Sequence, residues 1–387
     1  MYTSGRFRAF DHDFGIRTTD VALGNFVSNL LGPLARAGLP TWWYSIADRG
    51  PHVDGRYVLA IGPGEELVFD PPALALSTLF WHINRAAVRS CEGDVLIHAA
   101  AAEDNGRGLI FPASMEAGKT TLVAGLVQAG LRYLTDEAVA IAPVSLCVRG
   151  LAKPLTIEHG SWEVLADLKP DVPASVRHYA GSQWHVDVRT IRPDALAVSA
   201  TPSLVIVPRY ERGATTALTP LRRPLALMAL CENAFNLTER GQVGLDVLGE
   251  TVRRSECYRL VVGDLKAACA LVLDVLARSV VPPDATPLEH STPPSSVASV
   301  EIEGESVLLD TKTGALHHLD AIGTLIWACC DGSSSMDKLA VDLANAFNVD
   351  RKRARRDVSA FVRTLVSRGL LTPAEGARGP ARPVASG

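Results

Sequence analysis

The chain has 387 residues, of which 47% are hydrophobic and 21% charged, a balance typical of globular proteins with two or three separate cores. Its formal net charge of -4 lacks the excess of lysine and arginine that binding to a phosphate backbone requires, which argues against a nucleic-acid partner. The sequence shows neither a signal peptide nor an apolar run long enough to cross a bilayer, so we expect a cytoplasmic protein with no membrane partner.

Residues 1–90 are expected to form a small N-terminal subdomain, which ends in an amphipathic helix between Ala73 and Ser90. After it, apolar runs typical of strands, such as Val95–Ala101 and Gly108–Pro112, alternate with helical patterns such as Thr120–Gly130. This alternation predicts an α/β core over residues 91–279.

A phosphate-binding loop is predicted where the strand ending at Pro112 turns into the next helix. The pattern G-x-x-x-x-G-K-[ST] is met at every fixed position except the first, where Ala113 stands. In such a loop the backbone N–H groups face the anion, a lysine reaches the β- and γ-phosphates and the hydroxyl can bind Mg²⁺. The predicted nucleotide-binding residues are Ala113, Ser114, Met115, Glu116, Ala117, Gly118, Lys119, Thr120 and Thr121.

Polar residues in two neighbouring apolar runs are further candidates for the same site. Asp136 and Glu137 follow a short strand, where acids can hold Mg²⁺ or accept a proton from a hydroxyl, although paired acids also occur at solvated strand ends. His98 lies within an apolar strand, where, taken alone, a hydrogen-bonded core histidine is the better interpretation.

Taken in order, these segments resemble the HPr kinase/phosphorylase superfamily, especially its divergent kinase-like members. The resemblance rests on L-I-H-A-A-A around His98, on A-S-M-E-A-G-K-T-T from Ala113, and on Y-L-T-D-E-A-V-A-I from Tyr133. It implies a P-loop core that binds ATP, or another nucleoside triphosphate, together with Mg²⁺. Two later stretches, Lys153–Glu158 and the segment Glu232–Asn236, resemble a phosphate-contacting or metal-contacting loop and a helical segment of that family.

The resemblance also implies roles for single residues. Asp136 would act as general base or acid, with Glu137, His98 and Lys119 in the same catalytic site, and Thr120, Glu137 and Glu158 would hold the metal. The L-E-I-R-G-L-G string of true HPr kinases is not reproduced, and only Arg149-Gly-Leu matches part of it. This departure puts HPr itself in doubt as the substrate, and with it the phosphorylase reaction.

A stretch rich in proline, serine and threonine, residues 280–296, predicts a linker to a C-terminal module at 297–373, and residues 374–387 predict a disordered tail. In the module, strands at Ser306–Asp310 and Ala315–Leu319 flank a turn in which Gly314 permits a positive φ. Helices are predicted at Ile322–Cys330, Met336–Phe347 and Arg351–Arg368.

The string V-L-L-D-T-K-T-G-A-L-H-H-L-D-A-I-G-T-L-I-W, from Val307, resembles the PqqD family of winged-helix-like α+β modules. The resemblance implies recognition of the leader part of ribosomally made precursor peptides, which such modules take as an added strand. The expected peptide-binding residues are Leu316, His317, His318, Arg353 and Arg356. The basic residues between 351 and 356 are equally consistent with a solvated helix face, and the near balance of acidic and basic residues in the module argues against DNA binding.

Both halves together predict an ATP-dependent kinase that phosphorylates a hydroxyl, preferably of serine, on a precursor peptide held by the C-terminal module. Two alternatives stay open: a nucleotide-binding peptide chaperone or switch without phosphoryl transfer, and another ATP-dependent modification of a peptide or metabolite. The sequence also leaves a homo-oligomer open.

Overall fold

The computed structural model describes residues 1–50, 56–69, 72–114, 117–278, 296–328, 330, 340, 343–344 and 349–371. The linker predicted at 280–296, apart from Ser296, the tail at 374–387 and most of the helix predicted at Met336–Phe347 lie outside these residues. The chain divides into two compact units, Met1–His290 and Ser291–Gly387, which are described separately. Within the described residues, no helix is both long and apolar enough to span a bilayer.

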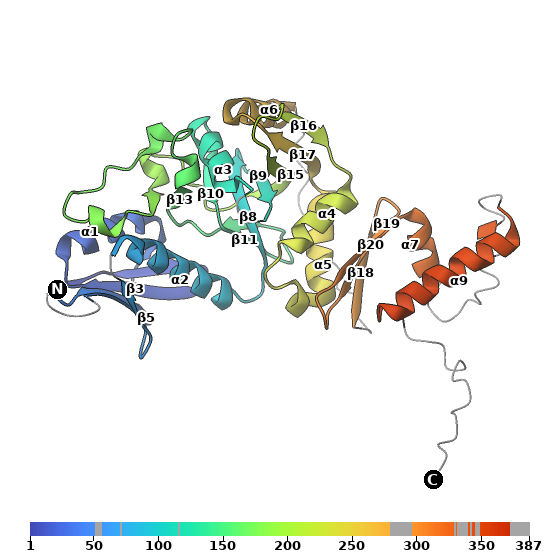
Figure 1. Ribbon diagram of the computed structural model, residues 1–387, viewed down its shortest axis with the longest axis horizontal. Coiled ribbons are helices and arrows are strands. Elements are labelled where there is room, and N and C mark those ends of the chain that lie inside the picture. The colour runs from blue at the N-terminus through green and yellow to red at the C-terminus, as the bar shows by residue number, and fades with distance from the viewer. Residues whose placement is uncertain are drawn as a thin grey trace, which may run out of the picture. The chain divides into compact units, whose positions relative to one another are not determined.

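The first unit begins with a mixed sheet whose strands lie in the order β4-β2-β3-β5-β6-β7, with β1 paired to β3. Its elements are β1 (Tyr2–Thr3), β2 (Arg6–Ala9), β3 (His12–Thr18), α1 (Val21–Leu30), β4 (Ala35–Arg36), β5 (Trp42–Asp48), β6 (Tyr57–Ile61), β7 (Glu66–Phe69) and α2 (Ala75–Ser90). Helix α2 packs against β2, β3 and β6 (Figure 1). The apolar side of α2, with Leu76, Leu79 and Ile83, packs in a core that also contains Val176 and Tyr179 from much later in the chain.

The second sheet of this unit runs in the order β12-β11-β8-β9-β15-β17-β16, and β10 pairs with β8. The elements from here to the end of the unit are β8 (Val95–Asp104), β9 (Arg107–Pro112), α3 (Lys119–Gln128), β10 (Arg132–Thr135), β11 (Ala138–Ile141), β12 (Val148–Gly150), β13 (Leu155–Glu158), β14 (Gln183–Val186), β15 (Thr201–Tyr210), β16 (Ala217–Pro220), α4 (Arg223–Glu232), α5 (Leu237–Arg253), β17 (Glu256–Val262) and α6 (Leu265–Arg278). Strands β9, β15 and β17 are parallel, so their carboxyl ends share one edge. Strand β8 is antiparallel to β9, and β13 and β14 form a separate antiparallel pair.

Both faces of this sheet are covered, as its apolar strands require. Successive side chains of β15 point to opposite faces of the sheet. Leu204 and Ile206 belong to the core beneath α3 and α6. Val205, between them, is also fully buried but is not part of that core cluster. Helices α4 and α5 pack against each other and against β17 (Figure 1). The result is an α/β layer arrangement that exposes the carboxyl ends of the parallel strands at one edge.

The segment Glu232–Asn236 is not helical throughout, which corrects the expectation of a helical segment. Helix α4 ends at Glu232, and the chain then pairs with β8, because the His98 N–H donates to the Asn233 carbonyl at 2.7 Å and the Phe235 N–H to the Leu96 carbonyl at 2.8 Å. Backbone groups that form hydrogen bonds with β8 are not available for the hydrogen bonds of a helix.

The second unit contains an antiparallel sheet in the order β18-β19-β20, built from β18 (Val297–Ile302), β19 (Glu305–Asp310) and β20 (Leu316–Leu319). Gly314 has a φ of 75° in the turn between β19 and β20, as predicted. Helices α7 (Ala321–Ala328) and α9 (Arg351–Ser367) follow, and the core contains Leu308, Leu319 and Leu365. The unit is a small α+β domain.

Candidate functional site

The predicted phosphate loop lies where β9 gives way to α3. Gly118, the residue before the helix, has a φ of 84°, a left-handed conformation that favours glycine. The first turn of α3 directs its free N–H groups toward this loop, as an anion site requires. Met115 and Glu116, two of the predicted loop residues, lie outside the described residues.

The Lys119 side chain is held at the base of this loop. Its Nζ donates to the carbonyl oxygens of Ala113 and Ser114, both at 2.7 Å, and lies 3.0 Å from Nε2 of His98. Only 6% of the residue is exposed, and this burial lowers the Lys119 pKa to about 8, although Glu137 and Asp136 nearby favour the charged form. The chain's own atoms therefore hold the ammonium group at the loop.

His98 reaches the loop from β8. Burial, followed by the charge of Lys119, lowers its pKa to about 4, so the imidazole is neutral near pH 7. Because an ammonium group only donates hydrogen bonds, Nε2 must be the acceptor, and Nδ1 then carries the proton. That Nδ1 lies 3.9 Å from Oε1 of Glu137.

Asp136 is buried between the phosphate loop and the strand pair β13 and β14. Its Oδ1 accepts from the Tyr133 hydroxyl at 2.7 Å and forms an ion pair with Lys153 Nζ at 2.6 Å. Its Oδ2 accepts from the Thr120 hydroxyl at 3.1 Å and from the Thr156 N–H at 3.2 Å. The side chains of Asp136 and Lys153 are each only 2% exposed. The carboxylate is thus fully hydrogen-bonded and is tied directly to the loop hydroxyl.

Glu137 presents a freer carboxylate in the same place. Its side chain is 37% exposed, and burial of the rest raises its pKa, against the lowering effect of Lys153 and Lys119. Its N–H is fixed by the Thr135 hydroxyl at 3.1 Å. Asp136 and Glu137 therefore differ in environment although they are neighbours in sequence.

The residues predicted to hold a metal are oxygen donors, which suits Mg²⁺. Thr120 and Glu137 lie at the loop, but Glu158 is exposed at the end of β13, and no hydrogen bond or ion pair of the described residues connects it with them. Within the described residues no cluster of three His, Cys, Asp or Glu side chains could hold a metal alone. The donor set fits an ion that takes most of its remaining ligands from nucleotide phosphates and water, as Mg²⁺ commonly does.

The sequence did not single out Tyr210 at this site. It placed Lys153 and Phe235 in stretches that resemble the family but gave neither residue a role of its own. The residues Tyr210 and Phe235 are 55% and 45% exposed. The Phe235 ring lies 5.8 Å from that of His98, and a Cβ on Gly118 would lie 3.6 Å from Cβ of Tyr210. No sequence motif marks an exposed aromatic residue at the end of a strand. Its position beside the loop becomes visible only when the neighbouring strands are known.

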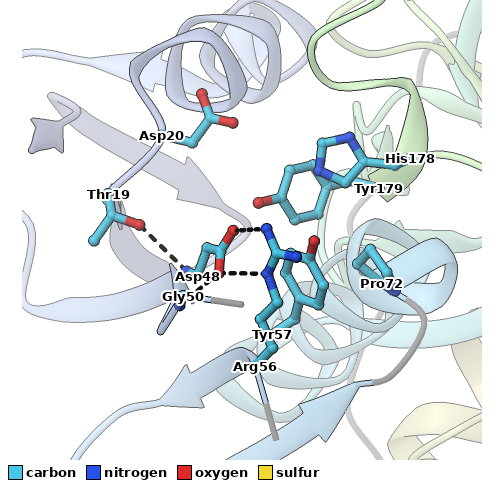
Figure 2. A pocket seen from close by; sticks show the side chains of 9 residues that line it. All are labelled: Thr19, Asp20, Asp48, Gly50, Arg56, Tyr57, Pro72, His178 and Tyr179. Atoms are coloured by element: carbon cyan, nitrogen blue, oxygen red, sulfur yellow. Dashed lines mark hydrogen bonds and ion pairs between the residues drawn. The ribbon is translucent and has the colours of Figure 1, made fainter. Parts of the chain in front are cut away.

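A pocket of about 560 Å³ opens elsewhere in the first unit, between the N-terminal sheet and the segment around Tyr179 (Figure 2). Arg56 and Asp48 form a bidentate ion pair in its wall, in which Nε and Nη2 of Arg56 donate to the two carboxylate oxygens of Asp48, each at 2.8 Å. This pairing lowers the Asp48 pKa to about 2. The lining residues are Thr19, Asp20, Asp48, Gly50, Arg56, Tyr57, Pro72, His178 and Tyr179. None of the predicted site residues is among them.

In the second unit the predicted peptide-binding residues lie on two elements. Leu316, His317 and His318 are partly exposed on β20, an edge strand of the described sheet, and His318 Nε2 lies 2.7 Å from a carboxylate oxygen of Glu305. Arg353 and Arg356 are exposed in the first half of α9. Arg353 lies 3.7 Å from Asp357, a solvated pair of little energetic weight.

Comparison with known proteins adds the following. The curated proteins contain no match to this chain. Among solved structures, the chain is similar to one titled "TbiB1 in Complex with the TbiA(beta) Leader Peptide", with 33% identity over 21% of this chain and 91% of that one and a TM-score of 0.19. It is also similar to the Hpr(Ser) kinase/phosphatase from Coxiella burnetii, with 12% identity over 47% of this chain and 93% of that one and a TM-score of 0.25. Residues 305–371 match the family described as "Coenzyme PQQ synthesis protein D (PqqD)", so the C-terminal part of the chain carries a PqqD domain.

Proposed function

We propose that this protein is an ATP-dependent phosphotransferase that phosphorylates a serine hydroxyl of a ribosomally made precursor peptide, and that it acts in the cytoplasm. In this proposal residues 91–279 form a P-loop core similar to HPr kinases, with residues 1–90 as its N-terminal subdomain. Residues 280–296 link it to the winged-helix-like PqqD domain at 297–373, which captures the peptide, and 374–387 form a tail.

The arrangement of Lys119, Thr120 and Asp136 carries the proposal. Two loop carbonyls hold the Lys119 ammonium group at the start of helix α3. The next residue, Thr120, donates its hydroxyl to the buried carboxylate of Asp136. Enzymes that act on nucleoside triphosphates use a lysine, a hydroxyl and a carboxylate in this way. The sequence motif supports the same interpretation, although Ala113 replaces its first glycine. Each part is ordinary alone, and their combination favours phosphoryl transfer.

The chain's own residues would divide the work as follows. Lys119 and the first N–H groups of α3 stabilise charge on the transferring phosphoryl group. Asp136 accepts the proton of the serine hydroxyl through Oδ2, because Oδ2 is held by two neutral donors whereas Oδ1 is held by the Lys153 ammonium. Glu137, with its raised pKa, is the next candidate for the base.

The metal would be held by Thr120 and Glu137, with Glu158 as a further predicted ligand. When bound with the nucleotide, Mg²⁺ supplies positive charge that offsets the charge on the phosphates.

The PqqD domain supports a peptide as the acceptor. Strand β20 is an edge of its sheet, and unpaired backbone groups at an edge can pair with an extended peptide. Partly exposed side chains on β20, Leu316 among them, would set the register of the added strand, and Arg353 and Arg356 would favour an acidic leader.

The test is to incubate the full chain with ATP, Mg²⁺ and a precursor peptide encoded beside its gene, and to measure the peptide by mass spectrometry. A kinase adds about 80 Da, the mass of one phosphoryl group. Fragmentation then identifies the modified residue. Binding of ATP and peptide without any change in mass would replace the kinase with a nucleotide-dependent peptide chaperone or switch, and another mass change would indicate a different ATP-dependent modification.

A further inference from the structure

Tyr210 presents an aromatic ring at a fixed position beside the phosphate loop. It is the last residue of β15, it is 55% exposed, and it adjoins Gly118. The strand holds its backbone in place, because Tyr210 is aligned with Val262 of β17 and the next residue, Glu211, donates its N–H to the Val262 carbonyl at 3.0 Å. The ring therefore stands on a rigid support.

The pairing of the strands explains why this ring is next to the loop. Val205 of β15 is aligned with Ile110 of β9, after which β9 ends at Pro112, whereas β15 continues to Tyr210. The last part of β15 thus runs past the end of β9, at the level where the loop begins. Ligands of open α/β sheets bind at this carboxyl edge.

The charged groups of the site lie on the opposite flank of β9. His98 comes from β8, and Asp136 and Glu137 follow β10, which pairs with β8, whereas β15 is the neighbour of β9 on the other side. If the terminal phosphate of a nucleotide lies among Lys119 and these acids, the molecule extends from the loop toward β15. Its base then arrives at Tyr210.

We propose that Tyr210 forms the base-binding subsite by stacking its ring against the nucleotide base. This inference rests on the proposed function, since it takes the loop to bind a nucleoside triphosphate. Stacking on a ring uses the π-face that every base has, so the subsite adds affinity for nucleotides over inorganic phosphates while discriminating little between adenine and guanine.

The test compares two probes by titration calorimetry with the full chain in the presence of Mg²⁺: ATP, and inorganic tripolyphosphate, which lacks the base and ribose. We expect Tyr210→Ala to weaken ATP binding at least about fivefold and to leave tripolyphosphate binding unchanged. Tyr210→Phe keeps the ring and should bind ATP like the wild type. Trp81→Ala, which removes another exposed aromatic side chain, on α2, is the matched control and should change neither affinity.

Each other outcome has a definite meaning. If Tyr210→Ala binds ATP as tightly as the wild type, or loses affinity for both probes equally, the base subsite is wrong while the phosphate loop stands. Loss of ATP affinity in Tyr210→Phe equal to that in Tyr210→Ala would also contradict stacking. If the wild type binds neither probe, the phosphate-loop function fails and the subsite fails with it.

Discussion

Every proton of the Lys119 ammonium group has an acceptor of the chain itself within hydrogen-bond distance. Two are the carbonyl oxygens of Ala113 and Ser114, and the third is Nε2 of His98. A phosphate that approaches the ammonium group must replace at least one of these partners. We expect a phosphate to replace His98 first, because His98 contributes a side chain whereas the two carbonyls belong to the backbone of the loop itself.

We predict that Lys119→Met lowers the rate of phosphoryl transfer about 100-fold or more, because removing one preorganised charge from such a site has a cost of this order. Methionine keeps the buried stem of the side chain, so the fold should survive better than with alanine. Single-turnover transfer to the precursor peptide measures the effect, with Lys169→Met on the exposed surface as the control. A folded Lys119→Met variant with wild-type turnover would remove the phosphate-loop interpretation.

Asp136 and Lys153 form a buried ion pair, so a change in either residue is expected to affect stability as well as activity. We predict that Asp136→Asn and Lys153→Met each lower the free energy of unfolding by about 3 to 5 kcal/mol, since either change leaves one buried charge unpaired. The double variant should lose much less than the sum of the two. Chemical denaturation of the four proteins gives this coupling as a double-mutant cycle.

The double variant also separates structure from catalysis. We expect it to fold and to bind nucleotide, because Lys119 is untouched, yet to lose transfer, because an amide cannot accept the hydroxyl proton. Normal transfer by the double variant would assign the proton to Glu137 or His98 instead. Additive losses of stability would mean that the ion pair is not coupled as the 2.6 Å distance implies.

The sequence predicts the individual strands, but it does not predict which segments lie beside one another in the fold. Gly108–Pro112 and Ala315–Leu319 were predicted from apolar pattern and turn residues and correspond to β9 and β20 within one residue at each end. Lys153 could not be paired with Asp136 in this way, because their contact depends on β13 lying beside the β10–β11 turn. The helical expectation for Glu232–Asn236 failed for the same reason, since a distant strand, β8, takes its backbone hydrogen bonds.

His185, on β14, makes this part of the first unit sensitive to acid. Its residue is 3% exposed, both ring nitrogens lack a hydrogen-bond partner among the described residues, and burial lowers its pKa from 6.5 to about 3. The unfolded chain therefore takes up the proton first as the pH falls, and stability is lost progressively between about pH 6.5 and 3. Between pH 7 and 5 this histidine alone should cost about 2 kcal/mol.

We predict that His185→Phe reduces the loss of stability between pH 7 and 5 by about that amount, whatever its effect at pH 7. Denaturant unfolding at both pH values measures the difference. His159→Gln, which changes an exposed histidine, should keep the wild-type pH dependence. An unchanged pH dependence in His185→Phe would mean that the buried ring is protonated in the folded protein or that other groups dominate.

In the described part of the chain, each hydrophobic core cluster belongs to one of the two units. The cluster beneath α3 and the cluster beneath α2 lie within the first unit, and those built on Leu308 and Ile326 lie within the second. The predicted site residues are divided in the same way, with Lys119 and Asp136 in one unit and β20 in the other. Chemistry and capture of the peptide are therefore expected to be separable.

Deleting residues 297–387 should mainly raise the apparent KM for the full-length precursor, and should leave the reaction with a short acceptor peptide unchanged when that peptide is saturating. A tethered binding domain raises the local concentration of its ligand, into the millimolar range for a short flexible linker, without adding catalytic groups. The rise in KM should therefore reach about 100-fold when the domain binds its leader in the micromolar range. Steady-state kinetics with both peptides measures the two effects separately. A loss of turnover with saturating short peptide would instead mean that the PqqD domain completes the active site or stabilises the first unit, because a tether alone cannot change the rate once the acceptor is bound.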